Sequence, residues 1–276
     1  MPSLPSFRVP PINELVLSLQ FATLSNLRTA HIGLFWELIR SKYSVTSEQT
    51  PLPPFFETFG GTRIEQNPTL RIETLFVPPF PRFWFENTQT GDLLQIQQDR
   101  FIRNWRQSPE NSRIYPRYEA VRDAFAGEAH QFEDWLGKEG LGQVLPNQCE
   151  VTYINLITLP DGTNPHQQLE RVTGLWSGQM GPDVEHSVEN TNIQLTCLFH
   201  QDGKPAGRIY ANFQAAYFTP NMVPVVRLDI TARGKPAGED IAAALTFMDV
   251  ARAQAVNTFA ALTTPEMHEF WGRIDA

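Results

Sequence analysis

The sequence predicts an α+β fold made of two tandem pseudo-repeats, each with the order strand, helix, antiparallel meander and long helix. Three observations support this prediction. Apolar residues alternate at the strand period in some segments, they recur every three or four residues in others, and the same order of segments begins twice along the 276 residues. A helix packed across a curved antiparallel sheet would bury the apolar side of each. We expect the two halves at residues 1–142 and 143–276.

The first half begins with a strand, because leucine and phenylalanine alternate with polar residues in ELVLSLQF. A helical spacing follows, and then several extended pieces, the last of which turns back at Asn87–Asp92. A second helical pattern is rich in aromatic residues and ends at Gly140. The expected elements are a strand (14–21), a helix (26–43), three extended segments (52–59, 69–77 and 83–101) and a long helix (115–140).

The second half repeats this order. Asn164 and Pro165 are typical of a helix start, and the residues from Gln201 to Lys204 are typical of a hairpin turn. Thr264 is expected to cap a short terminal helix. The expected elements are a strand (149–159), a helix from 165 through Trp176, three extended segments (191–200, 208–218 and 225–232) and a long helix (239–262). The alternative is a single mixed sheet whose apparent repetition is accidental.

Composition restricts the classes of function. The chain has 22 Lys+Arg against 30 Asp+Glu, a formal net charge of −8, which disfavours non-specific binding to phosphate backbones. It has no apolar stretch long enough to span a membrane and no basic, apolar leader at Met1, so we expect a cytoplasmic protein without membrane contact. Cys149 and Cys197 lie in apolar strand-like segments without metal-ligand spacing, and we expect two buried free thiols.

Candidate site residues come mainly from one dense cluster of amides, arginines and aromatics. Amide groups in the middle of a strand need partners, either across the sheet or from a ligand in a groove, and both interpretations are open. Arginines interleaved with aromatics could also bind an anionic group. The candidates are Gln95, Gln97, Asp99, Arg100, Asn104, Trp105, Arg106, Arg117, Tyr118, Glu150 and Asn155.

The strand pattern also predicts how these residues are distributed. In a continuous strand, Gln95, Gln97 and Asp99 would share one face, and Arg100 would lie on the other. Glu150 lies in an otherwise apolar strand, so a buried carboxylate there would need a basic partner, such as one of the first-half arginines. An internal Arg–Glu bridge and a binding site both remain open for Glu150.

Catalytic patterns are scarce. The sequence contains no phosphate-binding glycine loop, no nucleophile elbow and no histidine pair at the spacing of a helical metal site, so we expect no metal and no cofactor. Carboxylates could still meet in space, which leaves a hydrolase open.

The chain resembles a sporadically distributed bacterial family of uncharacterised proteins. The matching motifs include PPINE, from Pro10, LLQIQQDRFIRNWR, from Leu93, and QCEVTYIN, from Gln148. Matching stretches also cover residues 82–92, 115–125 and 262–272. The resemblance implies membership but supplies no reaction, cofactor or site residue. A patchy distribution would fit an accessory component of a defence or toxin–antitoxin system.

Three functions follow as hypotheses. The first is a non-catalytic binding protein for a protein partner or small ligand, based on the many aromatics and the missing catalytic motifs. The second is a hydrolase that uses Asp99, Glu119 or Glu150, with an arginine holding an anionic substrate. The third, which the net charge disfavours, is a nucleic-acid-binding saddle with Arg103, Trp105, Arg106 and Arg117 as contacts. The sequence leaves a homodimer open.

Overall fold

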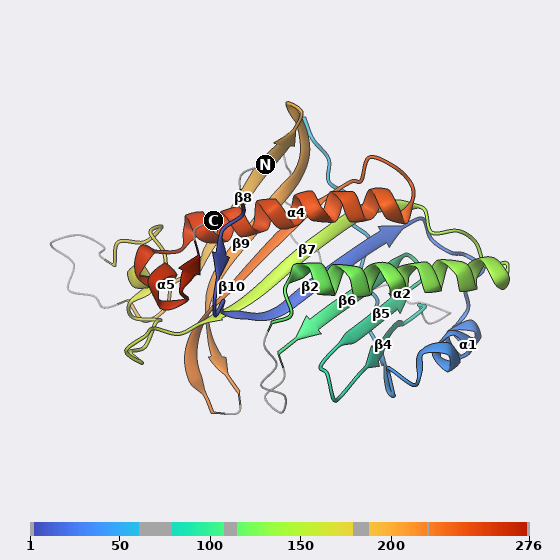
Figure 1. The fold of residues 1–276 in the computed structure, drawn as a ribbon, viewed down its shortest axis with the longest axis horizontal. Helices are drawn as coiled ribbons and strands as arrows, with labels where there is room; N and C mark the ends of the chain where they lie inside the picture. Colours follow the sequence, from blue (N-terminus) through green and yellow to red (C-terminus); the bar gives the residue numbers. More distant parts are fainter. Residues whose placement is uncertain (1–2, 61–78, 108–114, 179–187, 220, 275–276) are drawn as a thin grey trace.

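The computed structural model describes residues 3–60, 79–107, 115–178, 188–219 and 221–274. Within these ranges the fold is α+β, with a nine-stranded antiparallel sheet in the order β3-β4-β5-β6-β2-β7-β10-β9-β8 and a separate two-stranded pairing of β1 with β11 (Figure 1). The strands are β1 (Ser6–Phe7), β2 (Ile12–Phe21), β3 (Val45–Gln49), β4 (Arg82–Glu86), β5 (Leu93–Gln97), β6 (Arg100–Arg106), β7 (Pro146–Ile157), β8 (Ile193–Gln201), β9 (Lys204–Phe218), β10 (Val223–Gly234) and β11 (Arg273–Ile274).

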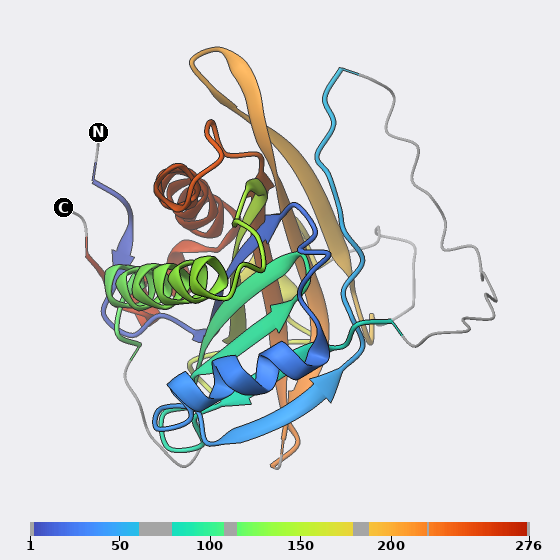
Figure 2. The same ribbon diagram turned by 90° about the vertical axis from the view of Figure 1, so that its right-hand side faces the viewer.

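Two long helices lie side by side on one face of the sheet, which we call the helix face (Figures 1 and 2). The first of them packs near β2 and β6, and the second packs over β7 and β10. The helices are α1 (Thr29–Ile39), α2 (Tyr118–Lys138), α3 (Leu169–Val172), α4 (Ile241–Leu262) and α5 (Pro265–Phe270).

The strand alternation explains where the core forms. Leu15, Leu17 and Leu19 of β2 point to the helix face and are fully buried, next to Val151 of β7. The buried aromatics of α1 and α2 complete this core, since Phe132 packs within 5.2 Å of the Phe35 ring centroid and 5.5 Å of the Phe101 centroid. The helix face is therefore the apolar side of the sheet, as expected from the period of two.

The opposite face of the sheet is polar, and residues 51–59 run across it (Figure 2). We call these residues the crossing segment. Sequence analysis predicts a meander strand at 52–59, and this is wrong, because no residue of the crossing segment is in a strand. Pro53 and Pro54 lack the N–H that a strand ladder requires. The expected strand at 69–77 lies outside the described residues.

The centre of the sheet joins the two halves of the chain. β2 and β7 are antiparallel neighbours, with Leu17 opposite Val151. After β2 the chain forms α1 and then β3, which is one edge strand of the sheet. It continues through β4, β5 and β6 back to the neighbour of β2, and α2 follows. From β7 it passes through α3, enters at the opposite edge with β8 and returns through β9 and β10 before α4 begins. The expected division after residue 142 falls between α2 and β7.

The expected turn at Asn87–Asp92 joins β4 to β5, but a second, tighter hairpin breaks the stretch after it that was predicted as one continuous strand. The chain reverses at Gln98 and Asp99, so that Gln97 pairs with Arg100. Gln95 and Gln97 therefore share the polar face with Arg100, and the predicted separation of these residues is wrong. The turn lacks the usual glycine or asparagine pair and is held instead by β2, since Phe21 donates to the Asp99 carbonyl at 3.0 Å.

Two smaller expectations also need correction. The helix expected from 165 through Trp176 is reduced to the single turn α3, because the Asn164 side chain accepts from the His166 backbone N–H in a local turn at 3.0 Å. Cys149 is buried as expected, whereas Cys197 is exposed, since it lies on the edge strand β8.

The described helices include none that is long and apolar enough to cross a membrane.

Candidate ligand-binding site

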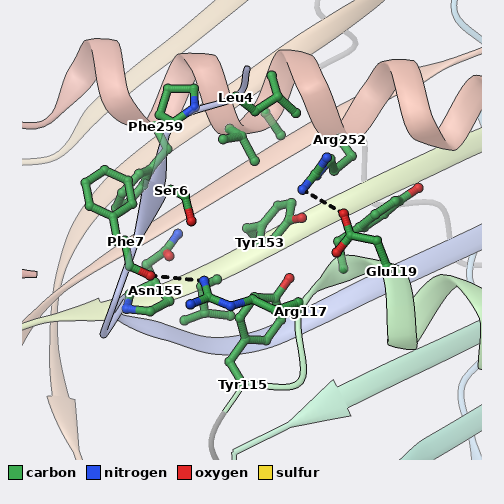
Figure 3. A pocket seen from close by; sticks show the side chains of 16 residues that line it. Leu4, Ser6, Phe7, Tyr115, Arg117, Glu119, Tyr153, Asn155, Arg252 and Phe259 are labelled. Carbon is green, nitrogen blue, oxygen red and sulfur yellow. Dashed lines mark hydrogen bonds and ion pairs between the residues drawn. The ribbon is translucent and has the colours of Figure 1, made fainter. Parts of the chain in front are cut away.

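A pocket of about 360 Å³ opens on the helix face, between the first residues of the chain, the start of α2, the middle of α4 and strands β2 and β7 (Figure 3). Its volume is at the lower end of the range typical of small-molecule sites. One wall is apolar and includes Phe7, Ile12, Val256 and Phe259. The other wall carries hydroxyl, amide and charged groups.

The N-terminal wall is fixed by contacts with the C-terminal end of the chain. Ser6 pairs with Ile274 in the β1–β11 ladder, and the Phe7 ring packs edge-on at 5.6 Å from Phe259 and 5.8 Å from Trp271. Such aromatic contacts favour a single arrangement of the rings. Residues before β2 are thereby held across α4, and they close one side of the pocket.

Three tyrosines line the polar wall. The Tyr153 hydroxyl interacts with Tyr115 and with Arg252, and the Arg252 guanidinium can only donate to it. Burial raises the pKa of Tyr153 to about 12 and raises the pKa values of Tyr115 and Tyr118 further. At neutral pH these hydroxyls are protonated, and they serve as hydrogen-bond donors rather than as bases.

Arg117 stands at the mouth of the pocket in a strained backbone conformation. Its φ of 74° and ψ of 159° lie in a region occupied almost only by glycine, at a cost on the order of 1–3 kcal/mol. It precedes α2 without capping the helix through its side chain. One nitrogen, Nη1, donates to the Phe7 carbonyl at 3.0 Å. Among the described residues no carboxylate forms an ion pair with Arg117.

Arg252 of α4 and Glu119 of α2 form the second charged group. Their side chains meet at 3.1 Å, and the Arg252 guanidinium lies over the Tyr118 ring at 5.1 Å. The Arg252 Nε is buried and has no hydrogen-bond partner in the part of the chain that the structure describes. Beyond the pocket, Tyr118 and Arg122 both donate to Asp249, which ties α2 to α4. The helices are thus bridged on either side of the Tyr118 ring.

The charged groups that line the pocket are mostly hydrogen-bond donors. Glu119 is the only carboxylate among the described residues that line the pocket, and its side chain is mostly exposed. The described residues contain no group of three or more histidine, cysteine, aspartate or glutamate side chains that could hold a metal ion. A neutral tyrosine can donate a hydrogen bond but cannot remove a proton at neutral pH.

The structure separates the candidate residues predicted from the sequence. Arg117, Tyr118 and Asn155 line the pocket, and Asn155 also donates to the Leu228 carbonyl at 3.0 Å. Trp105 lies on the helix face too, buried against Tyr115 at 5.3 Å between ring centroids. The remaining candidates lie on the polar face or in its hairpin turn: Gln95, Gln97, Asp99, Arg100, Asn104, Arg106 and Glu150.

Two glutamines on the polar face bind the main chain of the crossing segment. The Gln97 amide accepts from Leu52 N at 3.0 Å and donates to Leu52 O at 2.9 Å. Gln20 makes the same pair of bonds with Phe55, at 3.1 and 2.9 Å. Arg100 donates to Gln20 and to the Pro53 carbonyl. Gln20, Gln97 and Arg100 are therefore hydrogen-bonded to the protein itself.

The other polar-face candidates are engaged as well. Gln95 donates to Asn104 at 2.7 Å, and Asn104 donates in turn to Glu14. Arg106 pairs with Glu86 at 2.8 Å. Asp99, in the turn, accepts from Gln97.

Glu150 forms an ion pair, but its partner is Arg233 of β10 and not a first-half arginine. The Arg233 guanidinium also lies 3.6 Å from the Phe55 ring centroid.

The arginines considered for nucleic-acid binding do not share one surface. Arg103 is buried on the helix face against Glu128, at 2.9 Å, and Trp105 is buried beside it. Arg106 lies on the polar face and Arg117 at the pocket. Sequence reasoning missed the contribution of Arg252, although a lone arginine among the apolar residues of α4 was a signal that could have found it.

Comparisons of the chain with protein-family models, with curated proteins and with solved structures find no match. The geometry of the pocket is therefore the basis for a functional proposal.

Proposed function

We propose that this protein is a non-catalytic binding protein whose site is the pocket between α2, α4 and the N-terminal residues. The observation that carries this proposal is an open space of about 360 Å³ with an apolar wall facing protonated tyrosine hydroxyls and arginine donors. Ligand pockets combine a mostly apolar lining with a few convergent polar groups in this way. The proposal includes the cytoplasmic location expected from the sequence.

The fold supports the proposal because the pocket lies where the two halves meet. We propose that the halves are copies of one unit, since β2 and β7 are central neighbours and each is followed by a short helix, a meander from an edge and a long helix. The long helices α2 and α4 would then be equivalent. A space between two equivalent helices and their central strands is a natural place for a ligand.

The alternative of a hydrolase has less support. Of the three carboxylates considered for it, only Glu119 lines the pocket, while Glu150 and Asp99 belong to the opposite side of the sheet. A general acid and base would have to act within hydrogen-bond reach of one substrate. No pair among these three carboxylates meets that condition.

A pocket-filling substitution tests the proposal. Val256 lines the pocket from α4, and Val256→Trp should occupy its apolar end. Fragments containing a ring or short chain, of acidic, neutral and basic kinds, would be screened by ligand-observed NMR. We expect a subset to bind the wild type with Kd values below about 1 mM, and Val256→Trp should abolish their binding.

Asn257→Trp provides the control. Asn257 is the next residue of α4 and is exposed, so its substitution should leave fragment binding unchanged. Circular dichroism would establish that both variants are folded. Fragment binding that survives Val256→Trp, or the absence of any binding fragment, would count against the proposed site.

A further inference from the structure

The charge of the pocket differs from that of the whole chain. Its described lining residues include Arg117 and Arg252 but a single carboxylate, Glu119, so these described groups leave one positive charge in excess, while the chain carries a formal net charge of −8. Because Glu119 is paired with Arg252, the excess charge is that of Arg117. A binding site with an unmatched guanidinium favours a ligand with one negative charge.

Arg117 has the donors that such a ligand needs. A guanidinium carries five N–H groups, and the Phe7 carbonyl engages one nitrogen of Arg117. Figure 3 shows the Arg117 side chain extending along the pocket beside Asn155. The planar fork of a guanidinium can bind both oxygens of a carboxylate, with a charge-assisted bond on each.

The strained backbone at Arg117 is a separate observation. Glycine would adopt φ 74° and ψ 159° without strain, yet this position carries a long, charged side chain. Strained residues persist where the surrounding structure fixes them, and they cluster at binding and active sites. Arg117 lies at the N-cap of α2, and its side chain reaches the Phe7 carbonyl.

The polar groups on the other side of the pocket, like Arg117, are hydrogen-bond donors. Tyr115 and Tyr153 carry hydroxyls that are protonated at neutral pH, and the buried Arg252 Nε has no hydrogen-bond partner among the described residues. Figure 3 places Tyr153 between Arg117 and Arg252. Among the described lining residues a cationic ligand would find Glu119 alone as a charged acceptor, and Glu119 is already bound to Arg252. The available groups are therefore complementary to an anion.

We infer that the ligand is a small organic carboxylate, with its charged group at Arg117 and its apolar body against Phe7, Val256 and Phe259. This inference rests on the proposed function, because it names the chemical class that the same pocket takes. A monoanion matches the single excess charge, whereas a phosphate monoester would bring close to two negative charges. The limited volume restricts the body to one ring or a short chain.

Matched ligands test the inference. Phenylacetate, indole-3-acetate and hexanoate would each be titrated against the corresponding primary amide and amine, by ligand-observed NMR at low ionic strength and pH 7.5. The three ligands of a set share one body and differ in charge. We expect the carboxylates to bind at least about tenfold more tightly than the amides, since charge-assisted bonds are roughly twice as strong as neutral ones.

Arg117→Gly separates binding from folding. The substitution removes the guanidinium and also relieves the backbone strain, so the melting temperature should be unchanged or higher while the preference for acid over amide falls to about one. Arg122→Gln is the control. Arg122 pairs with Asp249 rather than with a lining residue of the pocket, and its removal should leave the preference intact.

The outcomes distinguish the two proposals. Amides or amines that bind as tightly as the acids, in a manner abolished by Val256→Trp, would overturn the carboxylate inference and leave the binding pocket standing. An acid preference that survives Arg117→Gly would also overturn it. If no member of any set binds while other fragments do, the carboxylate inference fails and the pocket stands, whereas the proposed function fails only if no fragment of any kind binds.

Discussion

The two faces of the sheet use the same kinds of side chain in opposite ways. On the polar face, Gln20, Gln97 and Arg100 bind the main chain of the crossing segment. On the helix face, at the pocket, no described carboxylate forms an ion pair with Arg117, and the buried Arg252 Nε has no hydrogen-bond partner among the described residues. The polar face therefore resembles a site that is already filled, and the pocket a site that is open.

This difference shows why residue type alone is a poor guide to binding. A buried amide or guanidinium must be matched somewhere, and the protein's own main chain can supply the match. The polar face holds more of the polar candidates than the pocket does, yet their bonds are internal. A binding site is better identified by donors that remain after the internal bonds have been assigned.

The largest predicted effect on the free energy of unfolding comes from breaking a buried ion pair on the helix face. Glu128 pairs with buried Arg103 at 2.9 Å and also accepts from Tyr43 and Lys42. In Glu128→Gln the Arg103 charge would keep only Asp92, at 3.5 Å. We expect a loss of about 3–5 kcal/mol in the free energy of unfolding, measured by urea denaturation.

An exposed ion pair gives the reference for that measurement. Glu37 pairs with Arg40 at 2.8 Å on α1, and both side chains are more than half exposed. Glu37→Gln should change the free energy of unfolding by about 1 kcal/mol or less. Equal losses in Glu37→Gln and Glu128→Gln would mean that burial does not make the Arg103 pair special.

Much of the fold could be predicted from the sequence, because periodicity reports which side of an element is buried. The strand at Leu15, Leu17 and Leu19 and the long helices α2 and α4 follow from it. The hairpin at Gln98 could not be predicted, since its turn is held by backbone bonds from β2, far away in the sequence. The same is true of the crossing segment, which is extended without being a strand.

The candidate site was predictable only in part. The pocket residues Arg117, Tyr118 and Asn155 were found because polar groups interrupt apolar or aromatic segments. They are separated from Gln95 and Gln97 because the side chains point to opposite faces of the sheet. A single unrecognised turn changes the face to which the following residues are assigned. The N-terminal wall at Phe7 depends on pairing with the other end of the chain, which no local pattern reveals.

A smaller loss of unfolding free energy is expected when the bonds between the polar face and the crossing segment are removed. Gln20→Ala would remove both bonds to the Phe55 main chain and one bond to Arg100. We expect a loss of about 1–3 kcal/mol, because buried polar groups would lose their partners. Hydrogen exchange should accelerate at the Phe55 N–H more than at the Leu52 N–H, which Gln97 still accepts.

Gln49→Ala is the matched control for this change. Gln49 lies on the edge strand β3 and makes one side-chain bond, to Ser47 at 3.3 Å. Its loss should alter the free energy of unfolding by about 0.5 kcal/mol or less. If Gln20→Ala were equally neutral, the crossing segment would not depend on the amide pairs, and the contrast between a filled and an open face would lose its basis.

The smallest effect concerns pH and the pocket tyrosines. Burial raises the pKa of Tyr153 to about 12, from a usual value of about 10. Between these values the unfolded chain loses the Tyr153 proton while the folded chain keeps it, so stability falls as pH rises. At pH 11 the expected loss relative to pH 8 is about 1.4 kcal/mol from this residue. Tyr115 and Tyr118 act in the same direction.

Urea denaturation at pH 8 and pH 11 measures this loss, and substitution assigns it. In Tyr153→Phe the fall in unfolding free energy between the two pH values should be smaller than in the wild type by about 1.4 kcal/mol. Tyr217→Phe, at a residue that is 56% exposed, should leave the fall unchanged. An identical fall in Tyr153→Phe and the wild type would mean that Tyr153 ionises as readily in the folded chain as in the unfolded one. The wall of the pocket at Tyr153 would then not be desolvated in the folded chain.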